Sequence, residues 1–286
     1  MKQIFSLIAV CCSMFVFSQK KLDNSLLWKV EGKNLSQPSY LYGTIHMICN
    51  NDFRFSDVLK KTISEVDKIG FEANMGDINQ LMEMQQNMAK IEKPLTEFLN
   101  DEDEKILNNY LQKKLHVGLQ NFDRMKPVAL MMTLTILHFP CEMTAMKSYE
   151  KEIGGFAKDQ QKKMFYLETL GEQWKILDAL PDQKEAEEIV EMVKKDKEYD
   201  EMSLKMIASY KKQNINEIHD LMEQQMDAEK TDRMLNNRNK NWIPKIENEI
   251  KDNSCLIAVG AGHLVGKEGL IQLLRAKGYK VTAVQQ

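Results

Sequence analysis

Several features that mark particular classes of protein are scarce in this sequence of 286 residues. It has five cysteines and no C-x-x-C or Cys/His cluster of the zinc-finger type. Lys and Arg are not concentrated in any segment, and the net charge is −3. This argues against nucleic acid or a charged membrane surface as a partner, because phosphate binding needs a clustered basic footprint. Repeats and linker-like stretches are also missing, which leaves a chain long enough to bury a full core.

The N-terminus has the pattern of a targeting segment. Lys2 precedes an apolar run, Ile4–Phe17, which is shorter than the roughly 20 apolar residues that span a bilayer. Ser18 offers a cleavage point before Gln19. We therefore expect a signal peptide over 1–18, export to the periplasm or the extracellular space, and no transmembrane span in the mature chain.

The cysteines fall into two groups under this interpretation. Cys11 and Cys12 lie in the predicted signal peptide, where a lipid anchor on one of them is the less favoured alternative. An exported chain can form disulfides, but the remaining three thiols allow at most one pair. Cys255 begins an apolar run and is expected in the core. Cys49 with Cys141 is the pairing to consider, and the sequence leaves open whether it forms.

Short apolar runs bounded by glycine or charged residues alternate with longer amphipathic segments. The runs fit buried strands of a mostly parallel sheet, and the longer segments fit helices over 100–115, 181–193 and 214–226. The strand-like runs are 26–30, 39–47, 67–73, 163–169, 255–260 and 279–284. We predict one α/β domain, with a mostly parallel sheet built from both chain ends and a large helical insertion between them.

Two of the strand-like runs end in the same motif, Gly-x-x-His. Gly43 precedes His46 in "YLYGTIHM", and Gly260 precedes His263 in "LIAVGAGHLVG". Sites of open α/β sheets lie at the carboxyl ends of strands, and glycine lets the backbone turn sharply and approach closely. We therefore expect both imidazoles to face one cleft. A helix expected over 266–277 would favour neutral His263 through its positive end.

Carboxylates end two further strand-like runs, Glu72 in "KIGFEA" and Glu168 in "FYLE". Two imidazoles and one carboxylate form a familiar ligand set for a catalytic divalent metal with an open position. The alternative is that each strand-end histidine is only a hydrogen-bonded structural residue. The other histidines lie in helical stretches without ligand-like spacing and are expected to be structural or surface residues: His116, His138 and His219.

Several phrases together resemble the TraB/GumN family, and the likeness spans essentially the whole mature chain, 19–286. The phrases are "YLYGTIH" (40–46), "GFEAN" (70–74), "YLETLGEQ" (166–173), "RNKNW" (238–242) and "AVGAGHLVGKEGLIQLLRAKGYKV" (258–281). That family is related to the Tiki proteins, which cleave secreted signalling peptides, and some members shut down peptide pheromones. One departure lies in 148–160, where the resemblance leads us to expect a Gly-x-Asp-like turn and Gly154-Gly155 stands instead.

The resemblance implies a metal-dependent, peptidase-like site made of His46, Glu72, Arg238 and His263. The two histidines would hold zinc, manganese or cobalt, and Glu72 would complete the ligand set or act as a general base. The planar fork of Arg238 suits paired oxygens, so it would steady a substrate carboxylate or a developing oxyanion. Around these residues we expect supporting roles for Glu168, Gln173, Gly43 and Gly260.

The sequence thus predicts an exported metal-dependent hydrolase that acts on peptide bonds, with a peptide or protein as its substrate. The alternative comes from another class, a protein that binds and sequesters a peptide without cleaving it. The substrate, the metal and the oligomeric state are left open.

Overall fold

A six-stranded sheet forms the centre of the computed structural model, which describes residues 21–286. The predicted signal peptide, its cleavage point, Cys11 and Cys12 lie outside the described residues. The strand order is β6-β4-β7-β2-β1-β8. The strands are β1 (Leu27–Glu31), β2 (Ser39–Thr44), β4 (Lys68–Phe71), β6 (Lys163–Tyr166), β7 (Cys255–Gly260) and β8 (Lys280–Val284). Each overlaps one of the six strand-like runs in the sequence.

The sheet is mostly parallel, as predicted. β6, β4, β7 and β2 are parallel neighbours, and β1 pairs antiparallel with both β2 and β8. Because only β1 is reversed, the carboxyl ends of β2, β4, β6 and β7 meet at one edge. β4 and β6 come from inside the chain, so the sheet draws strands from the interior as well as from the two ends.

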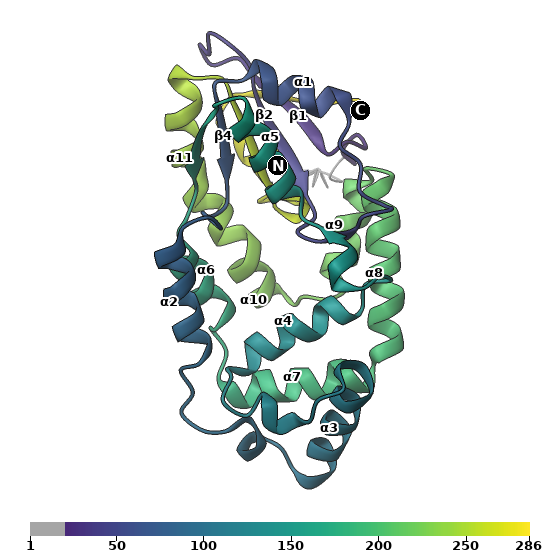
Figure 1. Cartoon of the computed structure of the whole chain (residues 1–286). Coiled ribbons are helices and arrows are strands. Elements are labelled where there is room, and N and C mark those ends of the chain that lie inside the picture. Colours follow the sequence, from purple (N-terminus) through teal and green to yellow (C-terminus); the bar gives the residue numbers. More distant parts are fainter. Residues whose placement is uncertain (1–20) are drawn as a thin grey trace, which may run out of the picture.

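Helices cover the sheet and form a second apolar cluster away from it. They are α1 (Asp57–Glu65), α2 (Ile78–Met88), α3 (Asp101–Leu115), α4 (Pro127–Leu137), α5 (Tyr149–Asp159), α6 (Leu170–Leu177), α7 (Asp182–Lys194), α8 (Asp196–Lys211), α9 (Ile215–Glu223), α10 (Ala228–Thr231), α11 (Asn237–Asp252) and α12 (Leu270–Ala276). In Figure 1, α1 and α5 lie over the sheet at one end of the molecule, and α3, α4 and α7 gather at the other. Buried side chains of α3, α4 and α7 share one cluster, and those of the strands, α11 and α12 share another.

Local sequence explains where several helices begin, and the structure corrects the predicted start of one. Asn100 caps α3 and Asn214 caps α9, each accepting from backbone N–H groups of the first turn. The helix predicted over 266–277 was wrong at its start, since α12 begins at Leu270. Gly266 has φ +87°, a left-handed conformation that a right-handed helix cannot contain. No helix within residues 21–286 combines the length and apolarity needed to cross a bilayer.

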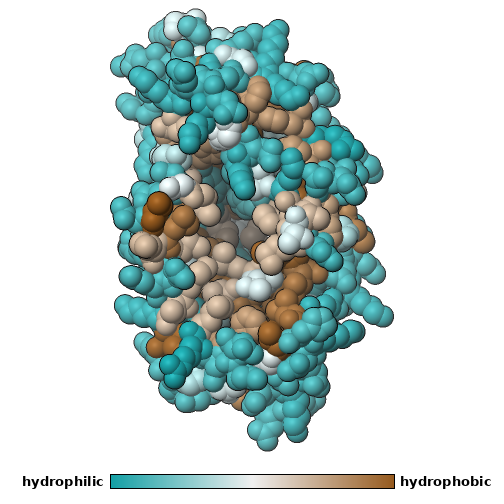
Figure 2. Space-filling view, viewed as in Figure 1, coloured by the Kyte–Doolittle hydropathy of each residue, from teal (hydrophilic) through white to brown (hydrophobic). Residues whose placement is uncertain are grey.

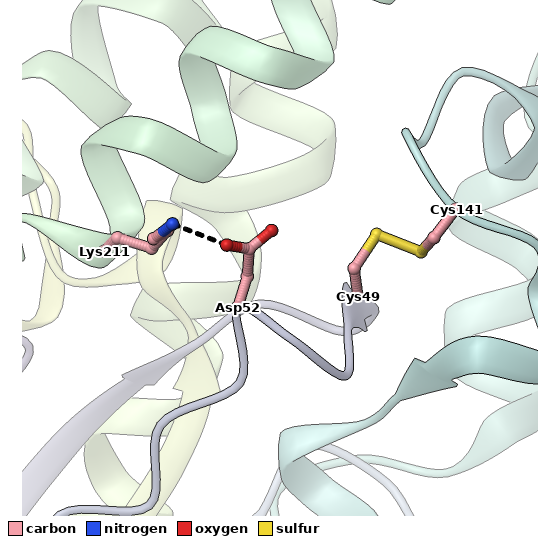
Figure 3. The surroundings of a disulfide bond; sticks show 4 residues. All are labelled: Cys49, Asp52, Cys141 and Lys211. Atoms are coloured by element: carbon pink, nitrogen blue, oxygen red, sulfur yellow. Dashed lines mark hydrogen bonds and ion pairs between the residues drawn. A yellow bond between two sulfur atoms is a disulfide. The ribbon is translucent and has the colours of Figure 1, made fainter.

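A disulfide joins Cys49, at the end of the short strand β3 (Ile48–Cys49), to Cys141 beyond α4. β3 pairs with β5 (Met146–Lys147) in a separate two-stranded ladder. Figure 3 shows the disulfide and the nearby ion pair in which Lys211 of α8 donates to Asp52 at 2.5 Å. The loop that follows β3 is therefore fixed to two helical regions, while Cys255 is free and buried.

Candidate functional site

The two Gly-x-x-His motifs lie side by side at the carboxyl edge of the sheet. β2 and β7 are parallel neighbours, with Gly43 opposite Val259 and Thr44 opposite Gly260. The motifs are therefore one residue out of register. A Cβ on Gly43 would stand 3.0 Å from the Cα of Ala261, so the backbone after β7 would have to shift to admit a side chain. Glycine at 43 therefore lets the chain leaving β7 approach β2 closely.

Three of the predicted site residues converge at Gly260. A Cβ built there would lie 3.4 Å from Glu72 Oε1 and 3.7 Å from both His46 Nε2 and His263 Cδ2. The Gly260 N–H also donates to Glu72 Oε1 at 2.7 Å. The absence of a side chain at this position keeps open the space that these side chains share.

His263 is a neutral imidazole with a defined tautomer. Asn239 uses its amide N–H groups on the carbonyls of His263 and Glu268, so its Oδ1 accepts from His263 Nδ1 at 2.7 Å. The lone pair of His263 is therefore on Nε2. Burial lowers the pKa of His263 to about 3, and Trp242 packs on the ring at 4.4 Å between centroids. Burial, rather than a helix over 266–277, keeps this histidine in the form that can bind a metal.

Glu72 is buried as a carboxylate beside Arg238. Its Oε2 accepts from Arg238 Nη2 at 2.5 Å and from Gln173 Nε2 at 3.2 Å. Burial alone would raise the pKa of Glu72, but the neighbouring side chains of His263, His46 and Arg238 and the Gly260 N–H outweigh it and hold the pKa at about 2. A carboxylate this weakly basic is better suited to holding a cation than to acting as a general base.

All five N–H donors of Arg238 are engaged. Nε and Nη2 donate to Glu168 at 3.3 and 2.5 Å, and Nη2 also donates to Glu72. Nη1 donates to the Met234 carbonyl at 3.0 Å and to the Nε2 lone pair of His263 at 3.1 Å. In this arrangement Arg238 has no donor left for a substrate oxygen. It holds Glu72, Glu168 and His263 relative to one another.

Glu168 has a supporting position in the same network. Besides the two bonds from Arg238, its Oε2 accepts from the indole N–H of Trp242 at 3.1 Å. Glu168 is 8% exposed and Glu72 is 7% exposed. Arg238 is therefore a buried cation shared by two buried carboxylates.

His46 is held by a residue that the sequence did not single out, Glu150. Its Oε1 is 2.9 Å from His46 Nδ1 and accepts from Thr44 Oγ1 at 2.6 Å. Desolvation lowers the pKa of His46, but the hydrogen bond and charge of Glu150 outweigh it and raise the pKa to about 9. The His46 side chain is 70% exposed, so solvent screens this pair and its net energy is small. Glu150 belongs to the segment 148–160, where the resemblance led us to expect a different turn.

The predicted ligands offer donor atoms of the kind that a divalent ion needs. His46 Nε2, His263 Nε2 and a Glu72 oxygen are donors that suit zinc, manganese or cobalt. His263 Nε2 lies 3.8 Å from Glu72 Oε1. Arg238 competes for the His263 lone pair and for Glu72 Oε2, whereas His46 Nε2 and Glu72 Oε1 are free of Arg238. The donor chemistry fits a metal once two changes occur: His46 must lose its Nε2 proton, because its pKa is raised to about 9, and Arg238 must release His263 Nε2.

Two tighter groups of ligand atoms, each within 4.8 Å, occur elsewhere among the described residues. They are His138 with Asp196 and Asp200, and Asp178 with Asp182 and Glu185. A lysine already stands in each: Lys114 lies 3.1 Å from Asp196, and Lys126 lies 2.8 Å from Asp182. These internal cations balance the acidic charge without a metal.

The fold and this edge define an α/β protein with a histidine, carboxylate and arginine cluster at the carboxyl ends of parallel strands. The chain belongs to the TraB/PrgY/gumN family, whose sequence model matches residues 26–283. Comparison with curated proteins and with solved structures gave no match.

Proposed function

We propose that this chain is an exported, metal-dependent hydrolase that acts on peptide bonds. The observation that supports the proposal most strongly is the convergence of His46, Glu72 and His263 around Gly260. These residues follow the neighbouring strands β2, β4 and β7, where ligands bind in open α/β sheets. Family membership is compatible with the proposal and does not name a substrate.

Each residue has a distinct role in this proposal. His46, His263 and Glu72 would hold the ion, which when bound would polarise a peptide carbonyl as a Lewis acid. Glu150 orients the His46 ring through Nδ1, and Asn239 orients the His263 ring in the same way. Arg238 would position Glu72, because all its donors are engaged with protein atoms, and the oxyanion role expected from the sequence would require one of these hydrogen bonds to break.

Export is supported by the Cys49–Cys141 disulfide. Such bonds persist in oxidising compartments and are rare in the cytosol. Intact mass of the secreted protein should correspond to a chain that begins at Gln19. A product that retains Met1 in the cytoplasm would contradict export.

One observation favours the sequestering alternative. Arg238 Nη1 donates to the lone pair of His263 Nε2 at 3.1 Å, so the hydrogen bonds of this buried network are satisfied without a metal. A protein that only binds peptides would keep this arrangement permanently.

Incubation with a broad peptide library, followed by mass spectrometry, separates the two functions. The hydrolase should produce fragments that EDTA abolishes and that zinc, manganese or cobalt restores. Intact peptide recovered in every condition, bound equally with and without EDTA, would contradict the hydrolase. The His263→Ala variant is the matched control, because it should lose cleavage in all metals.

A further inference from the structure

A cavity of about 520 Å³ lies next to the first Gly-x-x-His motif. A second cavity, of about 230 Å³, lies beside the disulfide away from the predicted site residues. The larger one is lined by α4, α7, α8 and the segment after α9, and one wall is Ile45, the residue directly before His46. Figure 2 shows a hollow in the middle of this face with apolar side chains around it, in the region between the sheet and α4 of Figure 1.

Methionine is the most frequent residue in the lining of this cavity. They come from three helices and a loop: Met131, Met192, Met202, Met206 and Met226. Unbranched thioether side chains adjust to apolar groups of varied shape, so such a surface accepts more than one apolar ligand. The volume falls within the range of small-ligand sites.

Two residues of the lining carry polar atoms without a partner. His138 has a side chain that is 3% exposed, and its Nδ1 lies 2.8 Å from Asp200 Oδ1. With Nδ1–H donated to that carboxylate, Nε2 is left, and it has no hydrogen-bond partner within residues 21–286. The buried Oγ of Ser203 likewise has none in the part of the chain that the structure describes. Buried polar atoms are nearly always paired, so two unpaired ones on one cavity wall indicate a ligand with polar groups as well as apolar ones.

We propose that this cavity receives a large apolar side chain of the peptide substrate, such as Leu, Met or Phe, next to the bond that is cleaved. Ile45 forms part of the cavity wall and His46 is the next residue, with Cα atoms about 3.8 Å apart, so the cavity adjoins the chain segment that carries His46. The amide groups flanking that side chain match the acceptor at His138 Nε2 and the hydroxyl of Ser203. This proposal rests on the proposed function, because it places the cavity beside the same site.

Peptide binding tests the cavity without cleavage. Labelled peptides Gly-Gly-X-Gly-Gly, with X as Leu, Met, Phe, Gly or Asp, are titrated in EDTA and followed by fluorescence anisotropy. The Leu, Met and Phe peptides should bind about 10- to 100-fold more tightly than the Gly peptide, the order of magnitude expected for burying such a side chain. The Asp peptide should bind no more tightly than the Gly peptide.

Matched variants test whether the preference for apolar X arises in the cavity. Met206→Glu places a charge in the cavity wall and should abolish the preference for apolar X. Met143→Glu, at a methionine that is 60% exposed and lies outside the cavity, should keep it. Met202→Glu is the second variant, used if Met206→Glu does not fold. A photoreactive diazirine analogue of Leu at X should label Met131, Met202 or Met206.

The outcomes separate this inference from the proposed function. If the protein prefers apolar X but cleaves no peptide in any metal, the proposed hydrolase is contradicted and the proposed role of the cavity is kept. If the protein cleaves peptides but shows no preference for apolar X, the hydrolase proposal is kept and the cavity proposal is overturned. The proposal is also overturned if folded Met206→Glu and Met202→Glu both keep the preference, or if the label falls outside the cavity. If neither variant folds, the wild-type peptide series and the position of the photoreactive label decide whether the cavity proposal holds.

Discussion

Replacing Arg238 by methionine removes the buried cation shared by two carboxylates. Glu72 and Glu168 are 7% and 8% exposed, and each accepts from Arg238 Nη2 at 2.5 Å. Removing one partner of a buried ion pair costs about 3–5 kcal/mol, because the other charge stays buried and unpaired. Arg238→Met should therefore lower the free energy of unfolding by about that amount at pH 7.

The pH dependence of stability gives a second estimate of how much the charged form of Glu72 stabilises the fold. The pKa of Glu72 is lowered from 4.5 to about 2. A depressed carboxyl pKa stabilises the fold above the unfolded value of 4.5, and the effect is lost as the pH falls from 4.5 towards 2. It corresponds to about 3 kcal/mol at neutral pH. The deficit of Arg238→Met should therefore shrink as the pH falls through this window.

Urea unfolding at pH 7 and pH 3, followed by tryptophan fluorescence, measures both quantities. The matched control is Lys211→Met, which removes an ion pair with Asp52 at a lysine that is 43% exposed. It should cost less than about 1 kcal/mol. The reasoning is refuted if Arg238→Met costs no more than Lys211→Met, or if its deficit is the same at both pH values.

Three further predictions follow from other parts of the molecule. Reducing the Cys49–Cys141 disulfide, which spans 92 residues, should lower stability by up to about 4.5 kcal/mol in urea unfolding; an unchanged midpoint would contradict this. Burial raises the pKa of Glu185 from 4.5 to about 7, so the wild-type protein loses stability as the pH rises from 4.5 to 7. Glu185→Gln should then raise Tm at pH 8 and not at pH 5, and an equal gain at both would refute it. Glu150→Gln should lower the pKa of His46 in NMR titration of the metal-free protein, whereas an unchanged pKa would remove Glu150 from its positioning role.

Much of the sheet and part of the site could be predicted because their signals are local. Apolar runs of five to nine residues indicate buried strands, and each of the six runs overlaps a strand. His46, Glu72 and His263 lie within three residues of the ends of β2, β4 and β7, so their shared edge follows from parallel pairing. The cap at Asn100 is likewise encoded within one helical turn.

Other contacts depend on residues that are distant in the sequence. Glu150 reaches His46 across 104 residues, and no spacing rule connects the start of a helix to a strand end. The acceptors that engage every Arg238 donor come from four segments of the chain, so the sequence alone could not show that Arg238 has no free donor. His138 was expected to be structural or surface, and only the assembled cavity shows its unpartnered Nε2. The helix predicted from residue 266 begins only at Leu270, because the positive φ of Gly266 cannot be read from helical periodicity.

Zinc affinity of matched variants, measured by chelator competition, tests most directly whether His46, Glu72 and His263 act as one metal site. We predict that His46→Ala and His263→Ala each weaken binding by at least about 10-fold. The double variant should lose less than the sum of the two, because both imidazoles hold one ion. His138→Ala is the control, since its acidic neighbours already have a lysine beside them. Wild-type affinity in both single variants, or a loss confined to His138→Ala, would contradict the account.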